Sequence, residues 1–247
     1  MRLYLIRHAE SANNALYAQT GSWHGRNSDP EITERGHRQS QRLGQLIANP
    51  DAETINLPFE KDDNHSFGLT HLYCSLMTRS ILTAHYVAEA CQLPLKALPH
   101  THERGGIYDL HRDGTKTGLA GRKRSYFTTR WPTLQLPDSV TEDGWYQRPF
   151  ETNKRFLGRV QQAVSDLLNW HQGSQDRVAL VAHGDFIDQF VNNIMGMPHN
   201  HANDTGDWAP NWAHNNTSIT RIDMIQERKV MIYLNRVDHL TPELVTW

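Results

Sequence analysis

Apolar residues along the chain gather in short runs, and two of these runs stop abruptly at polar side chains. Leu3–Ile6 leads into Arg7 and His8, and the near-continuous apolar run Arg177–Ala182 leads into His183. Runs of this length are typical of strands that are buried on both faces of a parallel sheet. Open α/β sheets bind ligands at the C-terminal ends of such strands. We therefore predict that both histidines lie at the ligand-binding edge of one sheet.

The rest of the pattern alternates between strands and helices. A 3.6-residue apolar period predicts helices that begin near residues 34, 77 and 185, and a longer helix over 153–171. Short apolar runs predict strands at 71–75 and 93–98 and a hairpin of 217–225 with 229–237. This order predicts the α/β class, with three layers (α/β/α) around a mostly parallel mixed sheet. No linker divides the chain, so we expect one domain over residues 1–247, in which the less regular stretches 110–150 and 196–214 form a cap or rim.

The composition limits the classes of protein to which the chain can belong. Its 247 residues are 38% hydrophobic and 21% charged, which is ordinary for a soluble globular protein. No stretch approaches the ~20 apolar residues of a membrane span, and Arg7 interrupts the N-terminal run too early for a signal peptide. We therefore expect a cytoplasmic protein with no membrane partner. A formal net charge of -2 provides no field to attract nucleic acid, and Cys74 and Cys91 are interpreted as buried thiols. The oligomeric state has no signal in the sequence.

Three features suggest phosphate chemistry. The guanidinium of Arg7 is a planar fork suited to phosphate oxygens, and its charge would keep the His8 imidazole neutral and nucleophilic. Arg79 falls in the first turn of a predicted helix, where a cation is unfavourable unless an anion binds there too. Glu103 follows a predicted strand and precedes two glycines, whose backbone can approach a ligand closely. Each feature alone is more often an ordinary surface or core residue, so the prediction depends on their joint occurrence.

Four segments form a set when they are taken in chain order: Arg7-His8-Ala9, Thr33-Glu34-Arg35-Gly36, Ser75–Ala84 and His183-Gly184. In this order they closely resemble the Arg-His-Gly, Leu-Thr-x-x-Gly, Ser-x-x-x-Arg-x-x-x-Thr-Ala and His-Gly motifs of the histidine phosphatase superfamily. That group includes the cofactor-dependent phosphoglycerate mutases. The resemblance extends over residues 1 to about 237, with Ala9 in place of the usual glycine.

The resemblance implies a covalent mechanism at the end of the first strand. His8 would attack phosphorus in line and become phosphohistidine. Arg7, Arg79 and His183 would hold the three non-bridging oxygens of the phosphoryl group. Gly184, at the N-terminus of the following helix, would add a backbone donor to the substrate site.

The same resemblance implies how protons move and what the protein binds. Glu103 would protonate the leaving alkoxide and then deprotonate the attacking water. Asn14 falls where the family often has a pocket asparagine, and Arg104 follows the acid as a second substrate-binding residue. The two arginines would supply the positive charge, so the resemblance implies no metal and no cofactor. The implied partner is a small phosphorylated substrate.

The resemblance permits either hydrolysis or isomerisation, and the residues favour a phosphatase over a cofactor-dependent phosphoglycerate mutase. Mutases of the family have Gly-Asn-Ser-Leu-Arg after the second histidine, whereas this chain has Asp185 and Asp188 in that segment. Added negative charge there would hinder binding of a carboxylate-bearing substrate. A basic cluster, Arg122-Lys123-Arg124, is the opposing observation, because a basic cap could recognise a second acidic group.

Two further alternatives come from other classes of protein. A metal site could be formed by the polar side chains of one loop: His199, His201, Asp204, Asp207 and His214. Their spacing matches no compact ligand motif, so an ordinary loop is the preferred interpretation. A non-catalytic phosphate-binding module is also possible, but the sequence retains every side chain that catalysis would need.

Overall fold

The computed structural model describes residues 1–49, 67–197, 211–226 and 228–247, and its centre is a six-stranded sheet with the order β3-β2-β6-β1-β7-β8. The strands are β1 (Arg2–Arg7), β2 (His71–Ser75), β3 (Leu95–Leu98), β6 (Arg177–Ala182), β7 (Ile219–Ile225) and β8 (Arg228–Arg236). The first four of these run parallel, and β7 and β8 are antiparallel additions at one side. The predicted mostly parallel mixed sheet is confirmed.

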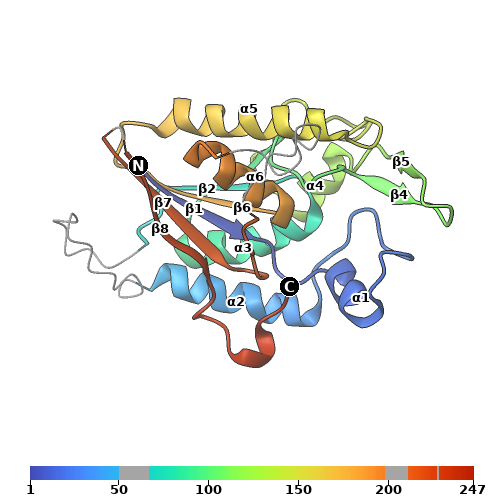
Figure 1. Ribbon diagram of the computed structural model, residues 1–247, viewed down its shortest axis with the longest axis horizontal. Coiled ribbons are helices and arrows are strands. Elements are labelled where there is room, and N and C mark those ends of the chain that lie inside the picture. Colours follow the sequence, from blue (N-terminus) through green and yellow to red (C-terminus); the bar gives the residue numbers. More distant parts are fainter. Residues whose placement is uncertain (50–66, 198–210, 227) are drawn as a thin grey trace.

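Helices cover both faces of the sheet, which gives the predicted three layers (Figure 1). Helices α2 (Glu34–Ala48) and α3 (Thr78–Cys91) pack on one face, and α5 (Asn153–His171) and α6 (Gly184–Met195) pack on the other. Successive strand residues alternate between the two cores: Tyr4 and Ile6 belong to the first, and Leu3 and Leu5 to the second. Because both faces of β1 are buried, its four central residues, Leu3–Ile6, are all apolar or aromatic rather than alternating with polar ones.

The register of the parallel strands brings three segments to one edge. Arg7 at the end of β1 is paired with Ala182 at the end of β6, and Cys74 near the end of β2 is paired with Val181. The residues that follow these three strands therefore start from neighbouring positions. His8, residues 75–79 and His183 meet at the C-terminal edge for this reason.

Helix α1 (Ala12–Thr20) is an element that the sequence analysis did not predict. Its amphipathic pattern is weak, so apolar periodicity does not reveal it. The signals lie at its ends. The Ser11 side chain accepts a hydrogen bond from the Asn14 backbone N–H, and the Asn14 side chain accepts one from the Ser11 backbone N–H. At the other end, Gly21 terminates the helix in the left-handed region.

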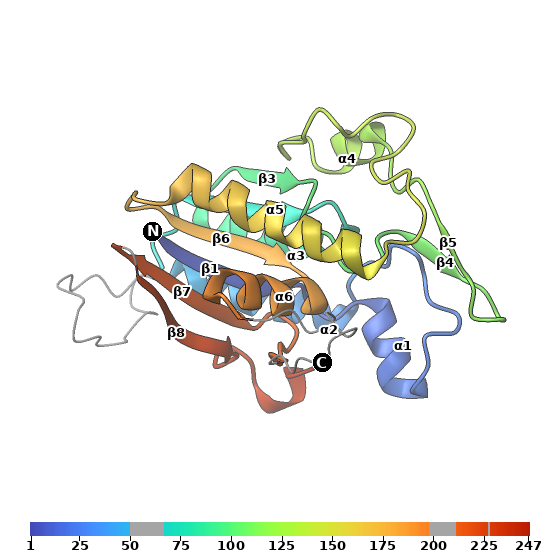
Figure 2. The ribbon, with the colours of Figure 1, turned by 45° about the horizontal axis from the view of Figure 1, so that its top comes forward.

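The stretch 110–150 also contains regular structure that the sequence analysis did not predict. Strands β4 (Tyr108–Leu110) and β5 (Lys116–Gly118) form a hairpin, and α4 (Arg124–Arg130) follows it. Figure 2 shows that α1 and the β4–β5 hairpin both lie beyond the C-terminal ends of β1 and β6. A short 3-10 helix, η1 (Pro242–Leu244), lies near the end of the chain.

Two expectations from composition can be checked in the described residues. None of the helices there is both long and apolar enough to cross a bilayer. Cys74 and Cys91 are free thiols, one in β2 and one at the end of α3, and burial raises the pKa of both. The interpretation as a buried group is confirmed for Cys74, whereas Cys91 is only partly buried.

Candidate active site

A cavity of about 340 Å³ opens at the C-terminal edge of the sheet. Seven of the eight predicted site residues line it: Arg7, His8, Asn14, Arg79, Glu103, Arg104 and Gly184. The eighth, His183, lies directly behind, with its ring centroid 5.1 Å from that of His8. The structure therefore brings together residues that are as much as 177 positions apart, Arg7 and Gly184.

His8 is held as a neutral ring with one nitrogen directed toward the arginines. Its Nδ1 lies 2.7 Å from the Ala9 carbonyl, which can only accept, so Nδ1 carries the proton. Nε2 accepts from Nε of Arg79 at 3.0 Å. Burial, followed by the charges of Arg79 and Arg7, holds the pKa of His8 well below its ordinary value. The lone pair that a nucleophile needs is therefore on Nε2.

His183 is oriented by a serine from the neighbouring strand. Ser75 Oγ lies 2.6 Å from His183 Nε2 and also accepts from the Met77 backbone N–H at 3.2 Å. Because Ser75 Oγ is already an acceptor, its own proton is available to Nε2, which favours the His183 tautomer with the proton on Nδ1. Burial, followed by the charge of Arg79, keeps the pKa of His183 well below its ordinary value. Nδ1 is buried and has no hydrogen-bond partner among the described residues.

The two arginines reach the cavity from different elements. Arg7, at the end of β1, donates from one terminal nitrogen to the His214 carbonyl, and its buried Nε has no partner among the described residues. Burial lowers the pKa of Arg7 to about 10, so it remains charged at neutral pH. Arg79 lies in the first turn of α3, as predicted, and is also almost fully buried.

Asp29 supports Arg79 from the loop between α1 and α2. Helix α3 has no side-chain cap of its own, and the buried Asp29 carboxylate replaces it. The carboxylate accepts from Thr78 N at 3.0 Å and from Thr78 Oγ1 at 2.6 Å. Its negative charge acts on Arg79 against the effect of burial, which lowers the pKa of that arginine. Asp29 therefore caps the helix and helps to retain a charged guanidinium in its first turn.

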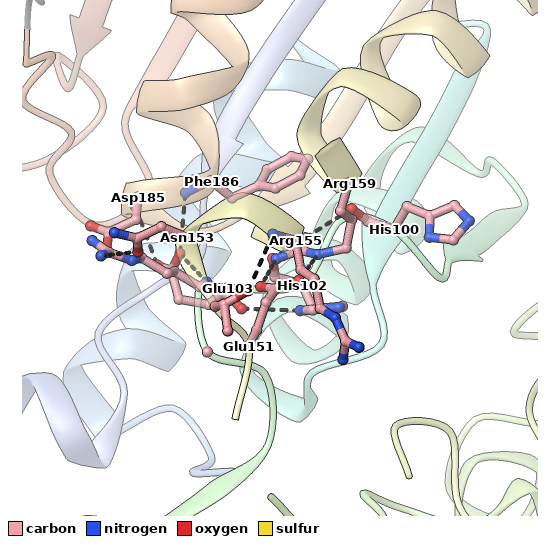
Figure 3. Close-up of polar contacts among 12 residues, drawn as sticks. His100, His102, Glu103, Glu151, Asn153, Arg155, Arg159, Asp185 and Phe186 are labelled. Carbon is pink, nitrogen blue, oxygen red and sulfur yellow. Dashed lines mark hydrogen bonds and ion pairs between the residues drawn. The ribbon is translucent and has the colours of Figure 1, made fainter. Parts of the chain in front are cut away.

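The Glu103 carboxylate lies against the N-terminus of α6 (Figure 3). It accepts from the backbone N–H of Phe186 at 3.1 Å and of Asp185 at 3.3 Å, and from its neighbour Arg104 at 2.8 Å. Burial, followed by the charge of Asp185, raises the pKa of Glu103 to about 7. A carboxyl group with this pKa can donate or accept a proton near neutral pH.

The loop that carries Glu103 is fixed by a buried ion pair that the sequence did not reveal. Arg159 of α5 forms two bonds to the Glu151 carboxylate, at 2.8 and 2.6 Å, and both side chains are buried. The same guanidinium donates to the carbonyls of His100 at 3.0 Å and His102 at 2.8 Å (Figure 3). The Arg159 side chain thus holds the backbone on the N-terminal side of Glu103.

The glycines after Glu103 also have a packing role, and Gly106 lines the cavity. Gly105 and Gly106 have φ values of +86° and +73°, and a Cβ on Gly106 would lie 2.0 Å from the Tyr146 ring. Tyr146 also donates to the Gly105 carbonyl at 3.1 Å. A Cβ on Gly105 would instead lie 2.5 Å from the Phe150 ring, so tight packing against two different aromatic rings requires the two glycines.

The backbone of His8 is held by Asn216, which belongs to a segment with glycosylation sequons. Its side chain is fully buried and donates to the His8 carbonyl at 2.9 Å. Thr246 Oγ1 in turn donates to Asn216 Oδ1 at 2.9 Å, which connects the residues after η1 to the end of β1. A sequon is not the signal for this role, and no local pattern in the sequence reveals it.

Comparison with known proteins agrees with this geometry. The family model of the histidine phosphatase superfamily (branch 1) matches residues 3–59 and 61–237. The chain belongs to this superfamily. Among its relatives, 2,3-bisphosphoglycerate-dependent phosphoglycerate mutase 1 of Latilactobacillus sakei is 33% identical over 213 residues, 78% of this chain and 79% of the relative. "Probable phosphoglycerate mutase GpmB" of Enterobacter sp. (strain 638) is 27% identical over 200 residues, 80% of this chain and 76% of the relative.

Solved structures share the fold. The alpha-ribazole phosphatase from Shigella flexneri superimposes with a TM-score of 0.58 at 20% identity, over 96% of this chain and 96% of the other. At this identity the likeness shows the histidine phosphatase fold and not the substrate.

Of the three predicted substrate-binding residues, Asn14 and Arg104 contact neighbouring side chains. Asn14 uses its side-chain oxygen to accept from Ser11, so its amide nitrogen is the group that it can offer to a ligand. Arg104 lies 4.0 Å from the Asp185 carboxylate and donates to Asn153. A Cβ added to the third, Gly184, would lie 3.5 Å from Arg7 Nε, so any larger residue narrows the space beside that guanidinium.

The basic residues of the 110–150 stretch are mostly used elsewhere. Lys116 lines the catalytic cavity. Arg122 lies 3.6 Å from the Asp29 carboxylate, Arg124 donates to the Pro137 and Val140 carbonyls, and Arg130 pairs with Glu31. Two residues of the Arg122-Lys123-Arg124 cluster, Arg122 and Arg124, therefore contact the framework, and none of the three lines the cavity.

Of the metal candidates, His199, His201, Asp204 and Asp207 lie outside the described residues. His214 is buried, and burial with the charge of Arg7 lowers its pKa to about 3. Within the described ranges one trio could hold an ion: His71, His171 and Asp176. It lies at the N-terminal edge of the sheet, where His171 already bonds Asp176 at 2.8 Å and Tyr73 at 3.0 Å. These contacts satisfy both nitrogens of His171 without a metal.

Proposed function

We propose that this protein hydrolyses a small phosphomonoester through a phosphohistidine on His8, without a metal or other cofactor. One observation carries the proposal. The neutral Nε2 of His8 lies 3.0 Å from Arg79 Nε, beside two buried donors, Arg7 Nε and His183 Nδ1, that have no partner among the described residues. A nucleophile surrounded by donors and cations fits a phosphoryl group, whose three non-bridging oxygens need such partners.

The first half-reaction transfers the phosphoryl group to the enzyme. Arg79 redirects its Nε–H from His8 to a phosphoryl oxygen, and Arg7 and His183 donate to the other oxygens. The lone pair of His8 Nε2 forms the N–P bond as the P–O bond to the alcohol breaks. Glu103, in its protonated form, gives its proton to the leaving oxygen.

The second half-reaction returns the enzyme to its starting state. The Glu103 carboxylate takes a proton from a water molecule, whose oxygen attacks phosphorus as the N–P bond breaks. The electron pair of that bond returns to Nε2, and inorganic phosphate leaves. A pKa of about 7 for Glu103 suits both halves, because the group must act first as an acid and then as a base.

The test is to trap the intermediate. Brief incubation with a reactive phosphoester, followed by denaturation, is expected to give an acid-labile and base-stable phosphoenzyme. His8→Ala is expected to abolish it, while His85→Ala, on the partly exposed side of α3, is expected to retain it. Label that persists in His8→Ala would overturn the assignment. Tight phosphate binding with no turnover would instead identify a non-catalytic binding module.

A mutase is the second candidate, and two observations favour it. The sequence relatives carry mutase names, and Arg26 and Lys116 line the cavity together with Arg104, so a second acidic group could be bound. Asp185 argues against a mutase, because its carboxylate lies near Arg104, and its backbone N–H contacts Glu103. Negative charge at this position hinders binding of a substrate that carries a carboxylate. The assay follows 3-phosphoglycerate with catalytic 2,3-bisphosphoglycerate. Appearance of 2-phosphoglycerate faster than free phosphate would establish the mutase.

A further inference from the structure

A second cavity, of about 450 Å³, adjoins the catalytic one. The two share five lining residues: Arg7, Asn14, Trp23, Gly184 and Asp185. The second cavity is also lined by Tyr17, Trp212 and Trp247, and we call it the aromatic compartment. Because Arg7 and Gly184 belong to both cavities, a phosphoester held by Arg7 can extend its alcohol into this compartment.

One wall of the aromatic compartment is a stacked pair of exposed rings. Tyr17 of α1 and Trp23 of the following loop have centroids 4.4 Å apart and an interplanar angle of 20°. Their side chains are 45% and 43% exposed. Large aromatic side chains that remain exposed beside a catalytic cavity are typical of ligand-binding surfaces.

The other wall comes from the opposite end of the chain and is held by hydrogen bonds. The Trp212 backbone N–H donates to Asp188 at 2.7 Å, and its indole N–H donates to Asn192 at 2.7 Å. The Trp247 ring lies 6.0 Å from the Arg7 guanidinium. The Trp212 indole, which these hydrogen bonds hold in place, presents a face at low conformational cost.

The charges of the two cavities differ. Asp185 and Asp188 line the aromatic compartment, where Arg7 is the lining cation, and Arg7 also faces the phosphoryl site. Arg26, Arg104 and Lys116 line the catalytic cavity instead. A second anionic group is therefore disfavoured in the aromatic compartment, whereas an uncharged planar ring can stack there.

Building on the proposed phosphatase reaction, we propose that the alcohol of the substrate carries an uncharged aromatic ring that binds in the aromatic compartment. A nucleoside 5′-monophosphate has this chemistry, with a phosphoester on a primary alcohol and a planar base at the far side of the sugar. The ring contributes binding energy, and the leaving oxygen stays beside Glu103.

The experiment compares two esters that share the same leaving group. Adenosine 5′-monophosphate and ribose 5-phosphate both release a primary alkoxide, and the adenine ring is present in the first alone. We expect kcat/KM to be about tenfold higher for the nucleotide, mostly through KM, because stacking one base on an aromatic side chain has an effect of this order. Tyr17→Leu and Trp23→Leu are expected to reduce this ratio toward one.

The ratio is measured within each variant, so a general loss of activity cancels. Trp170→Leu, which removes an exposed indole on α5 outside both cavities, is the control and is expected to leave the ratio unchanged. A ratio near one in the unmodified protein would overturn the ring proposal and leave the phosphatase proposal intact. Faster turnover of 3-phosphoglycerate than of the nucleotide would also overturn it.

A binding measurement separates the two proposals. Adenosine 5′-monophosphate is titrated into the His8→Ala protein while tryptophan fluorescence is followed, with ribose 5-phosphate as the comparison. Quenching by the nucleotide and not by ribose 5-phosphate supports the ring site. If the unmodified protein then hydrolyses neither ester, the phosphatase proposal is wrong while the ring site still stands. Equal responses to both esters would contradict the ring site.

Discussion

The phosphoryl end of the catalytic cavity and its leaving-group side are held in place in different ways. At the phosphoryl end, His8 and His183 directly follow two neighbouring parallel strands, whose backbone register fixes their positions. On the leaving-group side, Glu103 lies on a loop that is fixed by side chains, chiefly by the buried pair of Arg159 and Glu151. The difference suggests that phosphoryl binding is a property of the sheet, whereas proton transfer and substrate choice depend on contacts between distant loops.

This comparison predicts two kinds of variant. Changes at the phosphoryl end should slow every substrate by a similar factor, because every substrate presents the same group there. Changes on the leaving-group side should slow substrates to different degrees, and most of all those whose leaving oxygen must be protonated.

The largest effect is expected for Arg79→Gln. This change removes a buried cation that lies 3.0 Å from the nucleophile and would bind a phosphoryl oxygen in the proposed reaction. Loss of one such donor costs roughly 10²–10³ in rate. We expect this loss for alkyl and aryl phosphates alike, measured as kcat/KM. A loss confined to alkyl phosphates would place Arg79 on the leaving-group side and break the comparison.

Glu103→Gln is expected to have a smaller and more selective effect. Without a proton donor, turnover of alkyl phosphates should fall by roughly 10², while aryl phosphates, whose leaving group needs little protonation, should be affected much less. The measurement is the ratio of kcat/KM for p-nitrophenyl phosphate to that for an alkyl phosphate. Equal losses for both would assign proton transfer to another residue, with Asp185 as the nearest candidate.

The same division explains how much the sequence could predict. His8 and His183 were found because a buried strand leaves a local apolar pattern and its end marks the binding edge. Residues that fix the leaving-group side have no local pattern. Arg159 contacts His102 across 57 positions, and Asn216 contacts His8 across 208, so these roles arise only when the chain folds.

The missed elements have a related physical cause. Helix α1 is a short surface helix with little apolar periodicity, so its capping residues were the available signal. Strands β4 and β5 have three residues each, too few to show a period. The role of Asp29 as the cap of α3 depends on contact with Thr78, 49 positions away, so no local pattern indicates it.

A further prediction concerns the pH dependence. The negative charge of Asp185 is, after burial, the second cause that raises the pKa of Glu103 to about 7. Asp185→Asn should therefore lower this pKa. The first half-reaction needs protonated Glu103, so its rate falls as pH rises through the pKa, and in the variant this fall should begin at lower pH.

The measurement for Asp185→Asn is the single-turnover rate of phosphoenzyme formation from an alkyl phosphate as a function of pH. The effect at any one pH should stay below about tenfold, the factor that corresponds to one pKa unit. Asp113→Asn, at the exposed turn between β4 and β5, serves as the control. An unchanged or higher apparent pKa in Asp185→Asn would show that this charge does not act on the acid.

The smallest effect is expected from removal of metal ions. Arg7 and Arg79 supply positive charge within the cavity, and the one described trio that could hold an ion, His71 with His171 and Asp176, lies at the opposite edge of the sheet. Exhaustive chelation should therefore leave kcat and KM within about twofold. If zinc or magnesium restored a lost activity, His71→Ala would locate the ion. Continued restoration in that variant would exclude the trio and direct attention to the loop that contains His199 and His201. Either result would show that the reaction needs a bound ion in addition to the residues at the phosphoryl end and on the leaving-group side of the cavity.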